Sequence, residues 1–129
     1  MNAGKLIPET ILHVKTAKGI MIINPLEVLY LEAKNKHTFV YLNNMVCIET
    51  HHLLKWYGEK LLEPQFYRCH NSFIVNCFYI GYTCGESIIL DKNIYIPLSR
   101  KRKQQCKENL IRFKFNYTAK LQYYSTSLA

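Results

Sequence analysis

Short runs of β-forming residues recur along the chain with turn residues between them, and this pattern restricts the chain to a mainly β fold. The connections contain residues that tolerate turn geometry, among them Asn43-Asn44 and Cys84-Gly85. Such short links predict hairpins, so we expect consecutive strands to pair antiparallel. The expected strands are Ile11–Thr16, Gly19–Asn24, Val28–Ala33, His37–Asn43, Met45–Glu49, Ser72–Asn76, Phe78–Thr83, Ser87–Leu90 and Ile94–Pro97.

One segment departs from the β pattern and predicts a short helix packed on a sheet. Between His51 and Leu62 apolar residues recur every three to four positions, which is the period of a helix with one apolar stripe. Thr50 is expected to cap this helix, and Pro64 lies beyond its end. The stripe consists of Leu53, Trp56, Tyr57 and Leu61.

A second helix is expected to begin at Ser99 and to end near Phe115, and its first turn carries only cations. These cations are Arg100, Lys101, Arg102 and Lys103. A helix N-terminus carries partial positive charge, so each misplaced cation costs about 0.3 to 1 kcal/mol. A bound anion resolves this conflict, because the Ser99 hydroxyl, unpaired backbone N–H groups and cationic side chains together suit a phosphate. The alternative interpretation is an ordinary solvated face.

The charge of the chain is concentrated at its C-terminal end. Residues 1–98 carry nine Lys/Arg against eight Asp/Glu, whereas residues 99–129 carry eight against one, so +7 of the net +8 lies there. A local basic block predicts a polyanionic partner such as nucleic acid or anionic lipid. A length of 129 residues predicts one domain, 11–115, with an N-terminal extension 1–10 and a tail 116–129 that is disordered or folds on a partner.

The sequence favours a cytoplasmic protein without a cofactor, a metal or catalysis. It contains no signal pattern and no apolar run of membrane-spanning length, so no membrane partner is expected. Five cysteines without a C-x-x-C pair predict reduced thiols and fit no common zinc module. His70 and Ser72 lie close in sequence, but no acidic neighbour orients the histidine and no glycine-rich loop cradles a phosphate.

Two polar clusters end predicted strands and suit nucleic-acid recognition. In the first, Asn71 is able to pair with adenine, and in the second Arg100 or Lys101 is able to pair with guanine. Phosphates would be held by Arg68, Arg102 and Lys103. A third polar group, the loop Asn35-Lys36-His37, precedes a strand and suits contact with backbone or bases. The competing interpretation is local: Asn71 and Ser72 cap a turn, and His70 is half-buried and hydrogen-bonded.

The arrangement of these segments resembles the LytTR family of bacterial DNA-binding domains over about residues 10–111. The specific part is an R-x-H-x-S-[FY]-[IV]-V-N run followed some twenty residues later by I-P-[VL]-S-R. These two motifs lie within Phe66–Asn76 and Ile96–Lys101, and the run Leu29–Ala33 precedes them in the order of segments that carries the resemblance. The resemblance implies a β-sandwich of stacked antiparallel sheets whose loops enter successive major grooves at paired promoter repeats.

The resemblance also implies which residues face DNA. They are Asn35, Lys36 and His37, then His70, Asn71 and Ser72, and then Ser99, Arg100 and Lys101. Two positions depart from the family pattern. Asn71 stands where many members have arginine, which alters the preferred base, and Arg102 stands where an aromatic residue is common.

The prediction is a bacterial transcriptional regulator that binds duplex DNA sequence-specifically, with two copies on adjacent half-sites. Many members carry a phosphorylated receiver domain, so a sensor kinase or another regulatory partner is implied but not identified. Whether the chain is a stand-alone regulator or an excised domain is left open. The alternative is a β-rich signalling or interaction module whose basic helix, residues 99–114, binds an acidic protein or anionic lipid.

Overall fold

The computed structural model describes the backbone of residues 11–128 and the side chains as far as residue 116. It is mainly β, as the sequence predicts. The strands are β1 (Leu12–Thr16), β2 (Gly19–Ile23), β3 (Val28–Lys34), β4 (His37–Leu42), β5 (Cys47–Thr50), β6 (Phe66–His70), β7 (Phe73–Asn76), β8 (Ile80–Cys84), β9 (Ser87–Leu90) and β10 (Ile94–Pro97). The helices are α1 (Leu54–Lys60) and α2 (Lys103–Leu128), and a 3-10 turn at Arg100–Arg102 precedes α2.

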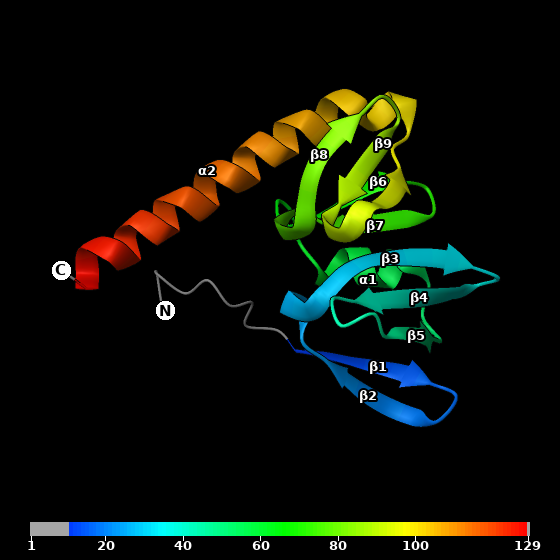
Figure 1. Cartoon of the computed structure of the whole chain (residues 1–129). Coiled ribbons are helices and arrows are strands. Elements are labelled where there is room, and N and C mark those ends of the chain that lie inside the picture. The colour runs from blue at the N-terminus through cyan, green and yellow to red at the C-terminus, as the bar shows by residue number, and fades with distance from the viewer. Residues whose placement is uncertain (1–10, 129) are drawn as a thin grey trace.

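The strands form three antiparallel sheets stacked in layers (Figure 1). The central sheet has five strands in the order β5-β4-β3-β7-β6, flanked by the β1-β2 pair and by the three-stranded sheet β10-β9-β8. The expectation of purely sequential pairing is wrong, because β2 and β3, and β7 and β8, lie in different sheets and β5 does not pair with the strand that follows it. β3 pairs with β7, with Leu31 opposite Ile74, although β4, β5, α1 and β6 separate the two strands along the chain.

The central sheet buries a hydrophobic core on each of its faces. Successive side chains of a strand point to opposite faces, so Ile74 enters one core and its neighbour Val75 enters the other. The first core lies among β1, β2, α1 and the sheet, with Tyr57 fully buried. The second contains Val75 together with Ile88 of β9 and Cys106 of α2. The second core therefore fixes the start of α2 against β6 and β7.

Helix α1 differs from the prediction in its length and in its N-cap, which is not Thr50. The helix is shorter than predicted, and Leu53 occupies the N-cap position without a side-chain hydrogen bond. Thr50 is instead a buried residue of β5, whose hydroxyl donates to the Thr38 carbonyl oxygen over 2.8 Å. Its oxygen lies 2.6 Å from the Tyr57 hydroxyl. Thr50 therefore links α1 to the sheet.

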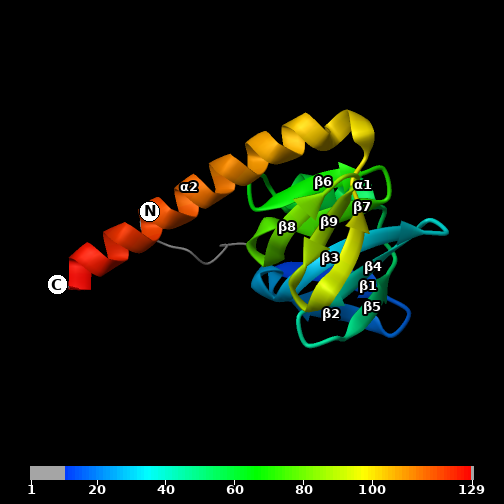
Figure 2. The same ribbon diagram turned by 45° about the horizontal axis from the view of Figure 1, so that its top comes forward.

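One further strand and the end of the second helix differ from the sequence prediction. The prediction omits Phe66–His70 as a strand of its own, but this segment forms β6 and pairs with β7. The second helix does not end near Phe115, because the backbone of α2 continues to Leu128. The segment predicted as a tail is thus helical over its described part, and α2 extends away from the sheets in both views (Figures 1 and 2). The predicted extension, residues 1–10, lies outside the described residues.

Candidate nucleic-acid interface

The three polar segments singled out by the sequence lie toward one end of the molecule. The β3–β4 turn, the β6–β7 turn and the start of α2 lie on the right in Figure 1, and Figure 2 shows the same arrangement from another direction. The β6–β7 turn and the start of α2 are joined directly. In the described residues no hydrogen bond or ion pair connects the Asn35–His37 segment to either of them.

The β6–β7 turn is held by a hydrogen bond between its backbone and the His70 side chain and by a backbone hydrogen bond to β3. The Ser72 N–H donates to Nδ1 of His70 over 3.1 Å, which fixes the imidazole beside the turn. The Ser72 carbonyl accepts from the Ala33 N–H over 2.8 Å. The ring of His70 also makes an edge contact with Phe73, with the ring centroids 5.8 Å apart. The local interpretation of His70 as half-buried and hydrogen-bonded therefore describes this structure.

Two arginines hold Asn71 from different elements. Arg68 of β6 donates to the Asn71 carbonyl, and Arg102 donates to the Asn71 side-chain oxygen over 3.1 Å. The Asn71 side-chain N–H₂ group donates to no described residue, and the residue is exposed. The amide is therefore held by its oxygen while its donor end faces solvent, which is the geometry needed to donate to a base or a phosphate.

Arg68 is a half-buried cation in this region. Desolvation lowers its pKa, and the nearby charge of Arg102 lowers it further. Its Nε atom is buried without a hydrogen-bond partner among the described residues. A guanidinium that is partly desolvated and close to a second one interacts strongly with an anion, because low dielectric strengthens charge interactions.

The start of α2 is tied to β6 through the backbone. The Ser99 N–H donates to the Cys69 carbonyl over 2.8 Å, and the Ser99 side chain makes no capping hydrogen bond. The first helical residues carry only cations, with no acidic residue in the 3-10 turn. Arg100 lies 3.6 Å from Glu86, but its side chain remains 85% exposed. Most of the cationic surface of this turn therefore faces solvent.

The β3–β4 turn contains two consecutive residues with positive φ angles. Asn35 and Lys36 have φ values of 49° and 66°, the left-handed conformation of tight hairpin turns. His37 follows at the start of β4, where its Nδ1 lies 2.8 Å from a carboxylate oxygen of Glu49. Its ring stacks on His51 with the centroids 4.4 Å apart. Asn35 and Lys36 are exposed, whereas these contacts hold His37 in place.

Sequence reasoning missed the acidic residues that contact the candidate site. Glu86 pairs with Arg100 and Glu49 pairs with His37, although neither acid belongs to a recognisable motif. Each pair joins different elements, so no short-range pattern could have revealed it. Both pairs lie on exposed side chains and contribute little to stability.

The histidines and cysteines were the other candidates for chemistry. The five cysteines are free thiols. Burial raises the pKa of the Cys69 and Cys77 thiols to about 12, so both are neutral and poorly nucleophilic at neutral pH. Among residues 11–128, no group of three or more His, Cys, Asp or Glu side chains is arranged to hold a metal. Within the same residues no helix is long and apolar enough to cross a membrane.

Comparison with known proteins identifies the class to which this fold belongs, a DNA-binding domain of regulatory proteins. The sequence model of the LytTr DNA-binding domain matches residues 18–111. The fold is similar to the solved LytTr DNA-binding domain of a protein from Bacillus cereus named as a methyl-accepting/DNA response regulator. That similarity has 26% identity and a TM-score of 0.67, and it covers 80% of this chain and 98% of the other. No curated protein matches this sequence.

The chain belongs to the LytTR family of DNA-binding domains. This membership confirms the resemblance seen in the sequence. It supports DNA binding by a transcriptional regulator, with DNA as the partner. The matched segment ends at residue 111, so most of the projecting part of α2 lies beyond the family domain.

Proposed function

We propose that this domain recognises a specific duplex sequence through the surface formed by the β6–β7 turn and the start of α2. The observation that carries the proposal is the hydrogen bond from Arg102 to Asn71, which joins these two elements into one polar and cationic surface. In this arrangement Asn71, Arg100 and Lys101 reach base edges in a major groove. A good bidentate contact there contributes about 1 to 3 kcal/mol of discrimination between bases.

The remaining residues position the domain on the DNA backbone. Arg68 and Arg102 hold Asn71 and face phosphates at the same time, and Lys103 holds a phosphate at the start of α2. His70, Ser72 and Ser99 support these elements through the hydrogen bonds of the turn and of the α2 start. The exposed Asn35 and Lys36, with His37, contact the backbone or a base further along the duplex.

In the cell, the domain acts in the cytoplasm as part of a bacterial transcriptional regulator, with two copies on adjacent promoter repeats. No catalysis or cofactor is required. The N–H₂ group of Asn71 is free to donate to adenine N7, and the second lone pair of its oxygen, beside the one that accepts from Arg102, is able to accept from the adenine N6 amino group, so the preference at its position is for adenine.

The decisive experiment is the selection of bound duplexes from a random pool. The proposal predicts an enriched motif in two similar half-sites, and a lack of any sequence ranking among duplexes would refute it. The same protein should be titrated with random duplex DNA, single-stranded RNA and vesicles containing anionic lipid. Preference for vesicles without sequence ranking would instead support the alternative, an interaction module that uses the basic helix of residues 99–114.

A further inference from the structure

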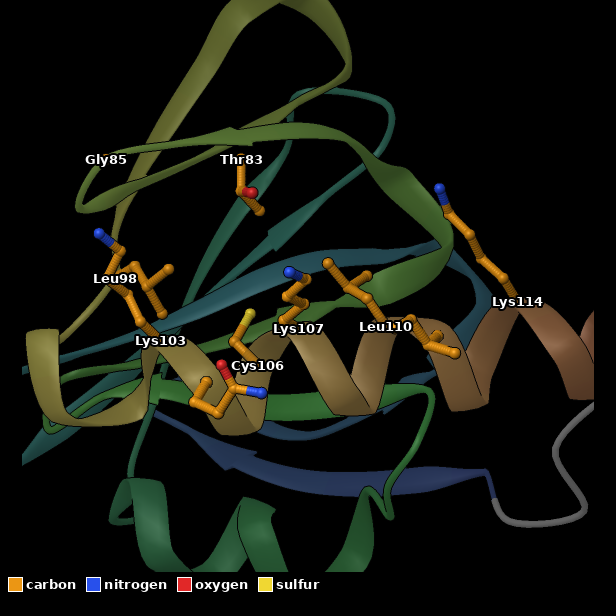
Figure 3. Close-up of a pocket in the computed structure, with 10 residues that line it drawn as sticks. Thr83, Gly85, Leu98, Lys103, Cys106, Lys107, Leu110 and Lys114 are labelled. Carbon is orange, nitrogen blue, oxygen red and sulfur yellow. The ribbon is translucent and has the colours of Figure 1, made fainter.

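A groove of about 500 Å³ lies between the first turns of α2 and the hairpin that joins β8 to β9 (Figure 3). It begins at Lys103 and runs along the helix to Lys114. The opposite wall is formed by Thr83 of β8 and Gly85 of the turn between β8 and β9. A site of this volume suits a small molecule, because ligand pockets in proteins measure roughly 300 to 1,000 Å³.

The floor of the groove is apolar. Leu98 and Cys106 are buried beneath it, and Leu110 is half-buried along it. Ile111 also lines the groove, and its side chain is 62% exposed. An apolar group in the groove would remove this isoleucine surface from water, at a gain of about 25 cal/mol for each Å² of apolar surface buried.

The rim of the groove is cationic and uncompensated. Lys103, Lys107 and Lys114 line it, and Figure 3 shows all three extending from the helix toward the hairpin side. None of them has a carboxylate within 4.0 Å among the described residues, and no lining residue is acidic. Lys103 and Lys107 also stand one helical turn apart, a like-charge spacing that destabilises a helix.

We propose that this groove binds a small amphiphilic carboxylate, with the apolar body on the Leu110–Ile111 floor and the carboxylate among the lysines. Each half of this ligand complements one observed feature of the groove. The carboxylate neutralises three unpaired lysines, and the apolar body covers Ile111. A phosphate backbone would use only the lysines and leave the floor exposed. The hydroxyl of Thr83 lines the groove and is able to donate to the carboxylate, whereas the side-chain amide of Gln104 donates to Glu108.

Occupation of the groove competes with DNA, a consequence that rests on the proposed function. Lys103 belongs both to the groove and to the set proposed to hold phosphates. A carboxylate beside Lys103 neutralises that charge and repels the DNA backbone. The ligand therefore releases the domain from its operator and acts as a chemical input to the regulator.

The direct test uses decanoate as the probe, below its critical micelle concentration and without DNA. Chemical-shift mapping on the full chain should show saturable changes at Ile111, Leu110 and Thr83. Acetate lacks the apolar body and decanol lacks the charge, so each should bind at least about tenfold more weakly. Changes of equal size with decanol, or changes that map away from α2 and the β8–β9 hairpin, would overturn the proposal.

Variants separate this groove from the DNA surface. A Lys107→Ala, Lys114→Ala double variant should weaken decanoate binding by about tenfold or more, while Lys55→Ala on α1 provides a matched loss of an exposed lysine elsewhere. Both variants should keep the parent affinity for duplex DNA. If the double variant instead loses DNA affinity and salt dependence but not decanoate binding, its lysines contact phosphates and the ligand proposal is wrong.

Competition is measured separately, with the duplex obtained by selection. Decanoate should lower DNA affinity in the parent and lose this effect in the double variant. Failure to bind any duplex would overturn the proposed function but leave the decanoate titration interpretable. Failure to bind decanoate, with DNA binding intact, would overturn the groove proposal alone.

Discussion

The guanidinium of Arg102 donates a 3.1 Å hydrogen bond to the side-chain oxygen of Asn71, a residue 31 positions earlier in the chain. This bond joins the turn between β6 and β7 to the 3-10 turn that precedes α2. Because it uses the oxygen of the amide, it determines which end of the Asn71 side chain faces solvent. One arginine thereby orients the group that we propose as a base reader.

The first prediction is that Arg102 and Asn71 act as a coupled pair in DNA recognition. Arg102→Ala removes the donor that orients the amide, so both Arg102→Ala and Asn71→Ala should relax sequence preference at the same base. A double-mutant cycle on DNA affinity should give a coupling energy of about 0.5 to 3 kcal/mol, the usual range for residues in contact. Anisotropy titrations of the selected duplex at fixed salt provide the measurement.

The orientation of Asn71 is separated from the charge of Arg102 by a conservative variant. Arg102→Lys keeps the positive charge but loses the planar guanidinium geometry, so it should retain overall affinity better than Arg102→Ala and still relax base preference. Independent effects at Asn71 and Arg102, with a coupling energy near zero, would show that the hydrogen bond has no part in recognition.

The second prediction concerns Arg100, whose side chain is 85% exposed beside Glu86. Arg100→Ala should weaken binding to the selected duplex by about 1 to 3 kcal/mol and relax the choice at one base position, as expected for loss of a bidentate contact. Glu86→Gln removes the acidic neighbour while keeping its shape, and it should leave base preference unchanged. Equal losses of affinity on all duplexes with Arg100→Ala would assign this residue to phosphate contact instead.

The sequence predicted which segments are strands better than it predicted how they pair. Alternating β-forming residues and turn dipeptides are local signals, and they correctly indicated a mainly β chain. The pairing of β3 with β7 depends on contacts between distant residues, such as Leu31 with Ile74. Hairpin rules describe only consecutive strands, so they could not predict this crossover.

The predicted start of helix α1 was wrong for a related reason. Thr50 has the chemistry of a helix cap, but its hydroxyl is used inside β5 and by Tyr57. In the candidate site, the motif identified Asn71 and Arg102 separately, and only the packing of α2 on β6 brings them together. The polar residue types were therefore predictable from the sequence, whereas their contacts were a product of the tertiary fold.

The third prediction tests the buried link between α1 and the central sheet. Tyr57 is fully buried, and its hydroxyl lies 2.6 Å from Thr50, whose own proton is donated to Thr38. Tyr57→Phe removes this donor while the ring remains packed, so the free energy of unfolding should fall by about 0.5 to 1.5 kcal/mol. Urea denaturation provides the measurement. Tyr95→Phe, at a residue that is 65% exposed, is the matched control and should have no measurable effect.

The fourth prediction is a loss of stability at alkaline pH caused by buried thiols. Burial, with a smaller contribution from Cys106, raises the pKa of Cys77 to about 12 in the folded protein. An unfolded thiol has a pKa near 8.5, so this contribution to stability is complete below about pH 8.5 and is lost as the pH rises toward 12. Within that window the slope is about 1.4 kcal/mol per pH unit for one thiol.

Urea denaturation under reducing conditions at about pH 8 and about pH 10.5 measures this slope. Cys77→Ala should be less stable than the parent at the lower pH but should lose less stability as the pH rises. Cys84→Ala removes an exposed thiol and should retain the parent slope. If Cys77→Ala and Cys84→Ala have the same pH dependence, the buried thiol is not the titrating group responsible.

The fifth prediction distinguishes the backbone contact of Lys103 from base reading. Lys103 is exposed at the first position of α2, where its backbone N–H donates to the Arg100 carbonyl and its side-chain ammonium is available to a phosphate. Lys103→Ala should weaken binding to selected and random duplexes by the same factor and reduce the salt slope by about one unit, because one fewer phosphate is neutralised. Titrations at several salt concentrations measure this slope, with Lys55→Ala as the control for loss of a distant charge. A change in base preference with Lys103→Ala, at an unchanged salt slope, would contradict the phosphate assignment and move Lys103 to the group of base readers.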